Sequence, residues 1–337
     1  MFQDKYNFSS GEPHFEVDKK IIQEIQNHVS GNCNYISVLG LNKLRDKCAK
    51  YEEMKIQKIK YTRENIIIGN GVSGLLSNLI GMYVKDNMSV LVIEPYYFSY
   101  LKLLEYRNCK IFYLNERFET IPYIKDLKII LFSNPSNPTG YCFSHNQLKQ
   151  IADYAKKNNV LIISDEIYSE YDYENKFSSI RLIYKDAIVL KGFSKSYSMT
   201  GMRLGYAIAP SNIINELAEF QLHSNICIPE AIQWGGVKAL DISIKDWIDY
   251  YKNNRDYIFN ELKSYISLEL PQGGLYYFLD IGDEDKFCNK AEEYGMIFRK
   301  GSNFCKKNNF VRMSFAVDKN FIEYNMSNIK KCIECSI

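Results

Sequence analysis

The strongest constraint on the fold is a regular alternation of short apolar runs with helical patterns along residues 65–209. A Gly-rich turn follows the first run, and Pro95 closes the second. Such alternation favours an α/β fold, in which helices cover both faces of a mainly parallel sheet. Strands are expected at residues 65–70, 89–95, 110–114, 128–133, 160–165, 187–194 and 203–209, of which the last could be antiparallel.

Helical patterns lie between these strands and continue beyond the last one. Ser144 with Gln147 three residues later forms a capping-box pattern, which predicts a helix over residues 144–158. Another helix is expected at 72–84, and several more are expected within 213–265.

The pattern changes after Pro271, where a second and smaller α/β unit is expected. Its elements are a strand at 273–281, a helix at 287–295, a strand at 310–316 and a terminal helix. We expect an N-terminal segment (1–30) that packs on the small domain, a large domain (31–250) and a small C-terminal domain (251–337).

Charge and hydropathy narrow the range of partners. The 42 Lys and Arg nearly balance 40 Asp and Glu, whereas a nucleic-acid-binding protein usually has a basic excess. No run approaches the roughly 18 uncharged apolar residues of a membrane span. The start, MFQDKYNFSSGEP, has polar and acidic residues where a signal peptide has an apolar core. We expect a cytoplasmic protein that binds small molecules and neither nucleic acid nor a membrane.

The nine cysteines, an odd number at irregular spacing, predict reduced thiols and not a disulfide framework. Cys332 and Cys335 form one C-x-x-C pair, but a zinc site needs two further ligands and no second pair follows. The four histidines also lack the spacing of metal ligands. No metal site is expected.

Chemically active side chains follow several of the predicted strands, at the sheet edge where α/β proteins bind ligands. Lys195 comes just beyond one apolar strand, and desolvation there would lower the pKa of its amine. Asp165 ends another strand, and Asn137 lies in the rigid turn SNPSNPTG. Taken alone, each also has an ordinary interpretation as a surface amine, a helix cap or a turn residue.

The turn Gly69–Gly74 joins a strand to a helix start, where backbone N–H groups favour a phosphate. It is neither G-x-G-x-x-G nor a P-loop, which argues against nicotinamide and ATP. Arg203, eight residues after Lys195, could add a charge-assisted contact. Pyridoxal phosphate needs this combination: an amine for its aldehyde, a carboxylate for its pyridine nitrogen, and phosphate donors.

Three motifs carry a resemblance to a known family, namely NPTG (137–140), DEIY (165–168) and SK-x(5)-GMRLGY (194–206). From GEP (11–13) to FVRMSFA (310–316), the chain resembles fold-type I pyridoxal-phosphate enzymes of the class I/II aminotransferase family. The resemblance implies a large domain with a mainly parallel central sheet between helices, a smaller C-terminal α/β domain, pyridoxal 5′-phosphate as cofactor, and a homodimer.

The resemblance also implies a role for each matching residue. Lys195 would hold the cofactor as a Schiff base and move the substrate proton, while Asp165 would pair with the pyridine nitrogen. Tyr168 and Asn137 would hydrogen-bond the ring oxygen, with a cis Asn137–Pro138 peptide. The other implied contacts are ring stacking by Tyr97 (with Tyr96 as the fallback), phosphate binding by Val72, Ser73, Gly74 and Arg203, carboxylate binding by Arg312, and a contact of Tyr35 with the phosphate in the partner subunit.

Two positions depart from the family pattern. Gly192 stands three residues before Lys195, where members usually carry a Ser or Thr that binds the phosphate. Ser194 or a water would have to replace that contact. Val72 stands where related enzymes often have a small or polar residue.

The two ends of the chain point to different subgroups. Arg299 and Arg312 resemble an arginine pair with which histidinol-phosphate aminotransferase and threonine-phosphate decarboxylase bind a substrate phosphate or carboxylate, although Arg299 could be an ordinary surface charge. FSSGEP resembles aminotransferases of ordinary amino acids, in which Gly11 lines the carboxylate site. We predict amino transfer from an amino acid or amino-phosphate compound to a 2-oxo acid. The alternatives are a decarboxylase or carbon–sulfur lyase of the same fold, and a non-catalytic cofactor-binding module.

Overall fold

The computed structural model describes residues 7–29, 34–56 and 59–337, and its larger sheet has seven strands. They are β1 (Ile66–Asn70), β2 (Ser89–Glu94), β3 (Lys110–Asn115), β4 (Leu127–Ser133), β5 (Leu161–Asp165), β6 (Ile188–Gly192) and β7 (Leu204–Ile208). Their order in the sheet is β1-β7-β6-β5-β4-β2-β3. All seven expected strands are confirmed, each with its ends within two residues of the prediction.

The large sheet is mainly parallel, as predicted. Strand β7 runs antiparallel to both of its neighbours, β1 and β6, while the pairs from β6 through β5, β4 and β2 to β3 are parallel. The interior strands β2 and β5 are almost completely buried, whereas the edge strand β3 is partly exposed. Continuous burial explains why the interior strands are apolar runs without alternation.

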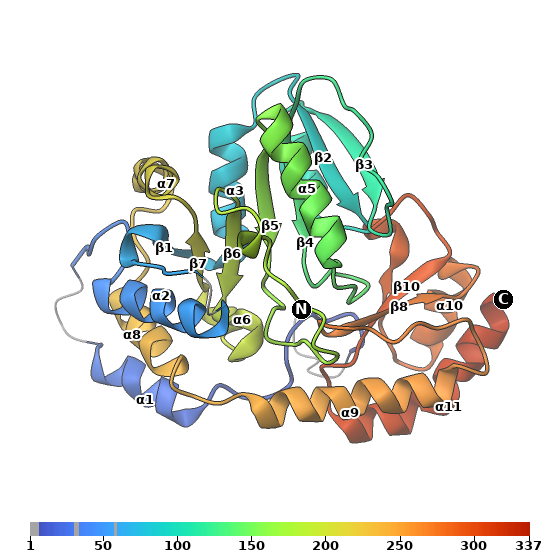
Figure 1. Ribbon diagram of the computed structural model, residues 1–337. Helices are drawn as coiled ribbons and strands as arrows, with labels where there is room; N and C mark the ends of the chain where they lie inside the picture. The colour runs from blue at the N-terminus through green and yellow to red at the C-terminus, as the bar shows by residue number, and fades with distance from the viewer. Residues whose placement is uncertain (1–6, 30–33, 57–58) are drawn as a thin grey trace.

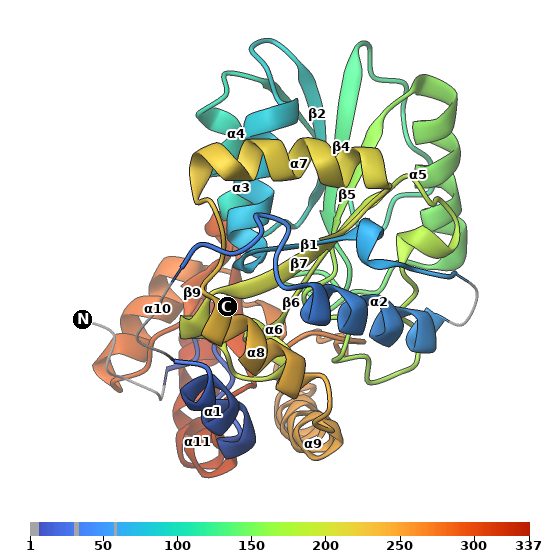
Figure 2. The ribbon, with the colours of Figure 1, turned by 90° about the vertical axis from the view of Figure 1, so that its left-hand side faces the viewer.

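Helices cover both faces of this sheet (Figures 1 and 2). They are α1 (Lys19–Asn27), α2 (Asn42–Ile56), α3 (Gly71–Tyr83), α4 (Ser99–Glu105), α5 (His145–Asn158), α6 (Phe193–Ser196), α7 (Ser211–Ser224), α8 (Glu230–Ala239), α9 (Lys245–Leu262), α10 (Glu284–Glu293) and α11 (Lys319–Ser336). Helices α2 and α5 contribute to the core on one face, and α3, α4 and α7 contribute to the core on the other. The predicted capping box is confirmed, because the Ser144 hydroxyl accepts a hydrogen bond from the Gln147 N–H at the start of α5.

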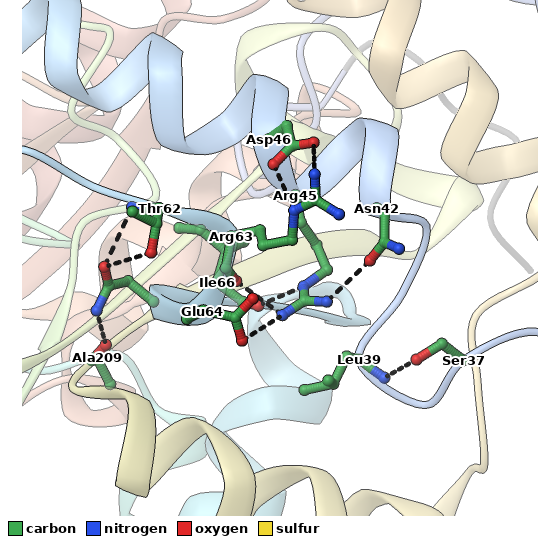
Figure 3. A network of polar contacts seen from close by, with 11 residues as sticks. Ser37, Leu39, Asn42, Arg45, Asp46, Thr62, Arg63, Glu64, Ile66 and Ala209 are labelled. Carbon is green, nitrogen blue, oxygen red and sulfur yellow. Dashed lines mark hydrogen bonds and ion pairs between the residues drawn. The ribbon is translucent and has the colours of Figure 1, made fainter.

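A buried arginine fixes the beginning of β1, the strand that leads into the Gly69–Gly74 turn (Figure 3). Arg45 on α2 is only 3% exposed. Its Nε donates to the Ile66 carbonyl at 2.9 Å, and its Nη2 donates to the Arg63 carbonyl at 2.8 Å. Because buried carbonyls need partners, this side chain anchors the polar helix α2 against the sheet.

The smaller sheet consists of β8 (Tyr276–Asp280), β9 (Arg299–Lys300) and β10 (Phe310–Ser314), in the order β8-β10-β9. Its pairs are antiparallel, and α10 and α11 lie beside it (Figure 1). The N-terminal segment packs here too. Phe8 is fully buried, with its ring centroid 5.0 Å from that of Phe298, and its carbonyl accepts a hydrogen bond from Ser314 N–H.

Helix α9 runs along the base of the molecule toward the smaller sheet, and the domain boundary predicted near residue 250 falls within it (Figure 1). The loop after β4 and the loop before β8 also meet, where Gly273 N–H donates to the Gly140 carbonyl at 2.8 Å. Within the described ranges, no helix is both long and apolar enough to cross a bilayer. The eight cysteines in those ranges are free thiols; Cys33 and the start of the chain, residues 1–6, lie outside the described residues.

Candidate active site

Lys195 lies at the carboxyl edge of the large sheet, on the short helix α6 that follows β6. Its Nζ donates a hydrogen bond to the Gly11 carbonyl at 2.8 Å, and its own carbonyl accepts one from the Tyr171 hydroxyl at 2.9 Å. The N-terminal segment therefore reaches the lysine directly. A covalent nucleophile needs such fixed positioning, because a freely rotating amine would rarely meet its substrate.

Asp165 ends β5, one strand away from β6, and is 4% exposed. Its carboxylate accepts hydrogen bonds from the Tyr100 hydroxyl at 2.9 Å and from Ile167 N–H at 3.2 Å. Burial raises the pKa of Asp165 to about 6, while these hydrogen bonds and the charge of Lys195 act in the opposite direction. A buried carboxylate in this state is suited to pair with a protonated ring nitrogen, whose charge would lower its pKa.

The start of α3 has the backbone geometry that favours an anion. Its first backbone N–H groups, around Val72, Ser73 and Gly74, lack partners within the helix, as in every α-helix. Gly71 has φ of +66°, and a Cβ built on it would lie 2.7 Å from Arg203 Nη2. The Arg203 guanidinium therefore lies against the glycine at the positive end of the helix, where a phosphate is favoured.

Replacing Gly71 with alanine is expected to weaken cofactor retention. Alanine in the left-handed region costs about 1–2 kcal/mol, and its methyl group would displace Arg203 from the turn. Titration of the cofactor, followed by absorbance, measures the effect as a higher dissociation constant. Gly201→Ala is the matched control, because a Cβ there meets nothing within 4 Å. Equal affinities for both variants would contradict the assigned turn.

Arg312, on β10, is a buried cation on the opposite wall of the site, 3% exposed. It donates hydrogen bonds to Asn137 Oδ1 at 3.0 Å and to the Ser9 carbonyl at 2.8 Å. Its guanidinium carbon lies 4.0 Å from the centroid of the Tyr276 ring. In the described ranges no carboxylate pairs with Arg312, and its Nε has no partner. Burying a cation costs free energy unless an anion pairs with it. Arg312 is therefore suited to bind a substrate carboxylate.

Arg299 lies directly opposite Arg312 in the antiparallel register of β9 and β10. Partial burial lowers the pKa of Arg299, and the nearby positive charge of Arg312 lowers it further. Its guanidinium carbon lies 5.6 Å from the centroid of the Phe98 ring. The structure therefore brings the two predicted arginines together, although Arg299 is far more exposed.

Tyrosines make up much of the remaining lining. Tyr168, 3% exposed, shares a 2.9 Å hydrogen bond with the Tyr276 hydroxyl, and burial raises its pKa well above the usual value. Tyr97 lies edge-on to Tyr100, the residue that binds Asp165, whereas Tyr96 is buried beside Tyr113. This geometry favours Tyr97 over its fallback.

Sequence reasoning missed Tyr100 and Tyr276. Both carry a signal that could have found them. Tyr100 is one turn beyond Tyr97, to whose carbonyl its N–H donates. Tyr276 begins β8, the strand that pairs with β10, which carries Arg312. Neither position predicts that the hydroxyl will bind a site residue. The hydrogen bonds Tyr100–Asp165 and Tyr276–Tyr168 join segments that are far apart in the chain.

Apolar groups surround Gly192. A Cβ built on Gly192 would lie 2.8 Å from Ile167 Cδ1 and 3.3 Å from Val72 Cγ2. The two departures from the family pattern are therefore neighbours in space, and they leave little room for a hydroxyl side chain at this position. Ser194, 9% exposed, remains the nearest hydroxyl in sequence before Lys195.

Two expectations fall outside this cluster. The prediction of a cis Asn137–Pro138 peptide is wrong, because the cis bonds in the described residues are Glu94–Pro95 and Asn134–Pro135. The motif contains two Asn-Pro steps, and the sequence alone does not distinguish which of them turns the chain. Tyr35, in the segment between α1 and α2, is 78% exposed and is not part of the buried lining around Lys195.

Known proteins resemble the chain along nearly its whole length. The profile of the family "Aminotransferase class I and II" matches residues 3–329. An aspartate aminotransferase of Sulfolobus acidocaldarius is 32% identical over 97% of this chain and 89% of its own.

Two solved structures are similar as well. The aspartate aminotransferase of Thermotoga maritima has a TM-score of 0.91 at 27% identity, over 98% of this chain and 92% of that one. A protein of Methanococcus jannaschii, described as similar to kynurenine aminotransferases in its active site, has a TM-score of 0.89 at 27% identity, over 97% and 91%. The lysine, the buried carboxylate and the glycine turn thus occur within a fold shared with transaminases, and the chain belongs to the class I and II aminotransferases, a family of pyridoxal-phosphate-dependent enzymes.

Proposed function

We propose that this aminotransferase moves the amino group of a dicarboxylic amino acid to a 2-oxo acid, with pyridoxal 5′-phosphate as cofactor. The observation that carries the choice of substrate is the facing pair Arg299 and Arg312, neither of which has a carboxylate partner in the described ranges. Directly opposite residues on antiparallel strands have Cα atoms about 5 Å apart. Two guanidinium groups at this spacing suit the two carboxylates of a short diacid.

The donor set supports the cofactor. Asp165 would pair with the pyridine nitrogen, Asn137 and Tyr168 would meet the ring oxygen, and Tyr97 would stack on the ring. The N–H groups of Val72, Ser73 and Gly74 would bind the phosphate, together with Arg203 and Ser194. When bound, the cofactor supplies an aldehyde for the amino group and a conjugated ring that withdraws electrons from the substrate Cα.

The protein's own groups then divide the work. Arg312 holds the α-carboxylate of the substrate and thereby fixes which Cα bond is presented to the ring. Lys195 Nζ would take the proton from the substrate Cα as a general base and release it again as a general acid. The Gly11 carbonyl, 2.8 Å from Nζ, orients that amine before the substrate arrives.

Arg299 would bind the second carboxylate of the substrate. Relatives with the name aspartate aminotransferase support a diacid over an amino-phosphate compound. The side chain is exposed at the mouth of the site, so its contribution should be smaller than that of buried Arg312.

The test is a panel of amino donors: aspartate, alanine and histidinol phosphate. Aspartate should give the highest kcat/KM, and Arg299→Gln should raise KM about tenfold for aspartate but little for alanine, as expected when one charge-assisted hydrogen bond is lost. Lys300→Gln is the matched control, since neighbouring residues of a strand point to opposite faces. An equal effect on alanine, or a preference for the phosphate compound, would exclude a diacid site. Release of carbon dioxide or ammonia would instead support the decarboxylase or lyase alternative.

A homodimer in the cytoplasm is also proposed. Tyr35 is 78% exposed, as a residue would be if it reached the phosphate of a partner subunit. The free thiols of the described cysteines fit a reducing compartment. Sedimentation of the purified protein would test the dimer, and Tyr35→Phe should weaken cofactor binding only if the dimer forms.

A further inference from the structure

A cavity of about 430 Å³ lies between the two sheets, where β2 and β3 end. Its walls include Glu94, Glu116 and Thr139 from the large sheet's side. Phe278, Asp280 and Phe310 line it from the smaller sheet. This volume lies within the usual range of about 300–1,000 Å³ for pockets that bind small molecules.

None of the residues that line the cavity belongs to the candidate active site, although Phe278 lies directly opposite Arg312 in the register of β8 and β10. Tyr276, Phe278 and Asp280 alternate along β8 and therefore share one face. Tyr276 belongs to the active site, while Asp280, four residues further on, lies about 13 Å along the strand. Phe304 contacts residues of both sites. Its ring is edge-on to that of Phe278, and its ring centroid lies 4.8 Å from the Arg312 guanidinium carbon.

Four carboxylates and three cations line the cavity, so acidic groups are in excess by one; the cations are Arg117, Lys306 and Lys307, and the charge of Arg117 acts on Glu116. Of its carboxylates, Glu269 pairs with Arg117, but within the described ranges no ion pair joins Glu94, Glu116 or Asp280 to a cation. Their partners are neutral: Lys306 N–H, the Thr139 hydroxyl and the Asn309 amide, respectively. The two lysines of the cavity, Lys306 and Lys307, have their ammonium groups over the rings of Tyr113 and Phe310.

Glu116 is the buried member of this set, 4% exposed. Its Oε2 accepts the Thr139 hydroxyl at 2.8 Å, and burial raises its pKa to about 7. A positive charge beside it would favour the ionised form. The rings of Phe278 and Phe310 also line the cavity; they stack with centroids 4.7 Å apart and form its apolar wall.

We propose that this cavity is a second binding site, specific for a small organic cation with an apolar body. The ammonium group lies among Glu116, Glu94 and Asp280, and the apolar body packs on the Phe278–Phe310 wall. Cations and aromatic rings attract each other through the ring quadrupole, which adds to the contact with the carboxylates. Such a ligand touches both sheets and so joins the two parts of the molecule.

The experiment titrates the cofactor-saturated protein with benzyltrimethylammonium by calorimetry, at about pH 8 so that Glu116 is ionised. This quaternary cation cannot form an imine, so it does not react with an aldehyde in the active site. We expect saturable binding of one molecule per chain, and weaker binding of the neutral compound benzyl alcohol. Because no amino donor is present, the result is independent of the proposed substrate.

Variants locate the bound cation. Glu116→Gln should weaken binding about tenfold, as expected for about 1.4 kcal/mol of lost charge contact. Asp280→Asn changes an exposed side chain and should weaken binding severalfold, which keeps the test valid if Glu116→Gln is unstable. Glu334→Gln removes the same charge from the exposed face of α11 and should change nothing. Absence of saturable binding at millimolar concentration would overturn the proposal, as would equal affinities of Glu116→Gln, Asp280→Asn and Glu334→Gln for the cation.

Discussion

Lys195→Ala is expected to reduce the rate of amino transfer about 10⁴-fold, the largest effect of any single substitution in this chain. The residue has two functions, because the same Nζ would bind the cofactor covalently and carry the substrate proton. Its hydrogen bond to Gly11 and the hydrogen bond from Tyr171 to its carbonyl hold that amine in one place. No other described amine is so placed, so no neighbour can substitute for it.

Two measurements check this result. Purified wild-type protein should be yellow, and after borohydride reduction its Lys195 peptide should carry the mass of the cofactor. Lys185→Ala, which removes an exposed lysine before β6, should retain the colour and the activity. A wild type that stays colourless when saturated with cofactor, or an adduct at another lysine, would refute the assignment.

Arg312→Ala is expected to weaken the binding of carboxylate substrates in the transition state by about 2–5 kcal/mol. This is the cost of removing one partner from a buried charge pair. The loss should fall on kcat/KM for every amino acid, because the α-carboxylate is common to all of them. Arg312→Lys should recover only part of it, since an ammonium cannot make two parallel hydrogen bonds to a carboxylate. Comparing Arg312→Ala with Arg312→Lys separates the effect of the lost charge from the effect of the lost bidentate geometry.

Steady-state kinetics with several amino donors provides the measurement. Arg312 also holds Asn137 and the Ser9 carbonyl, so the melting temperature of each variant should be recorded beside its kinetics. If Arg312→Ala left kcat/KM unchanged while the protein stayed folded, the carboxylate would have to bind elsewhere.

Much of the large sheet could be predicted because its signals are local. Apolar runs such as Leu161–Asp165 are long enough for one buried strand and too short for a helix. The capping box at Ser144 marks a helix start within a few residues. By contrast, α2 is mostly polar and is anchored by Arg45, whose partners come from a later segment, so nothing in its own sequence reveals its burial.

The candidate site also has one part that follows from local sequence and another that depends on contacts between distant segments. Lys195, Asp165, Asn137 and Arg312 stand in short motifs, so the family resemblance could propose them from the sequence. The contacts that orient them join segments far apart in the chain, as when Tyr100 binds Asp165 or Gly11 meets Lys195. Such pairings depend on packing, which a sequence pattern does not encode.

The position of the N-terminal segment has a practical consequence for recombinant work. Because Phe8 to Gly11 contact β10 and the lysine amine, an affinity tag at the amino end would be joined close in sequence to a segment that contacts the candidate active site. Ile337 is 76% exposed. A purification handle or a fluorescent label is therefore better joined to the carboxyl end.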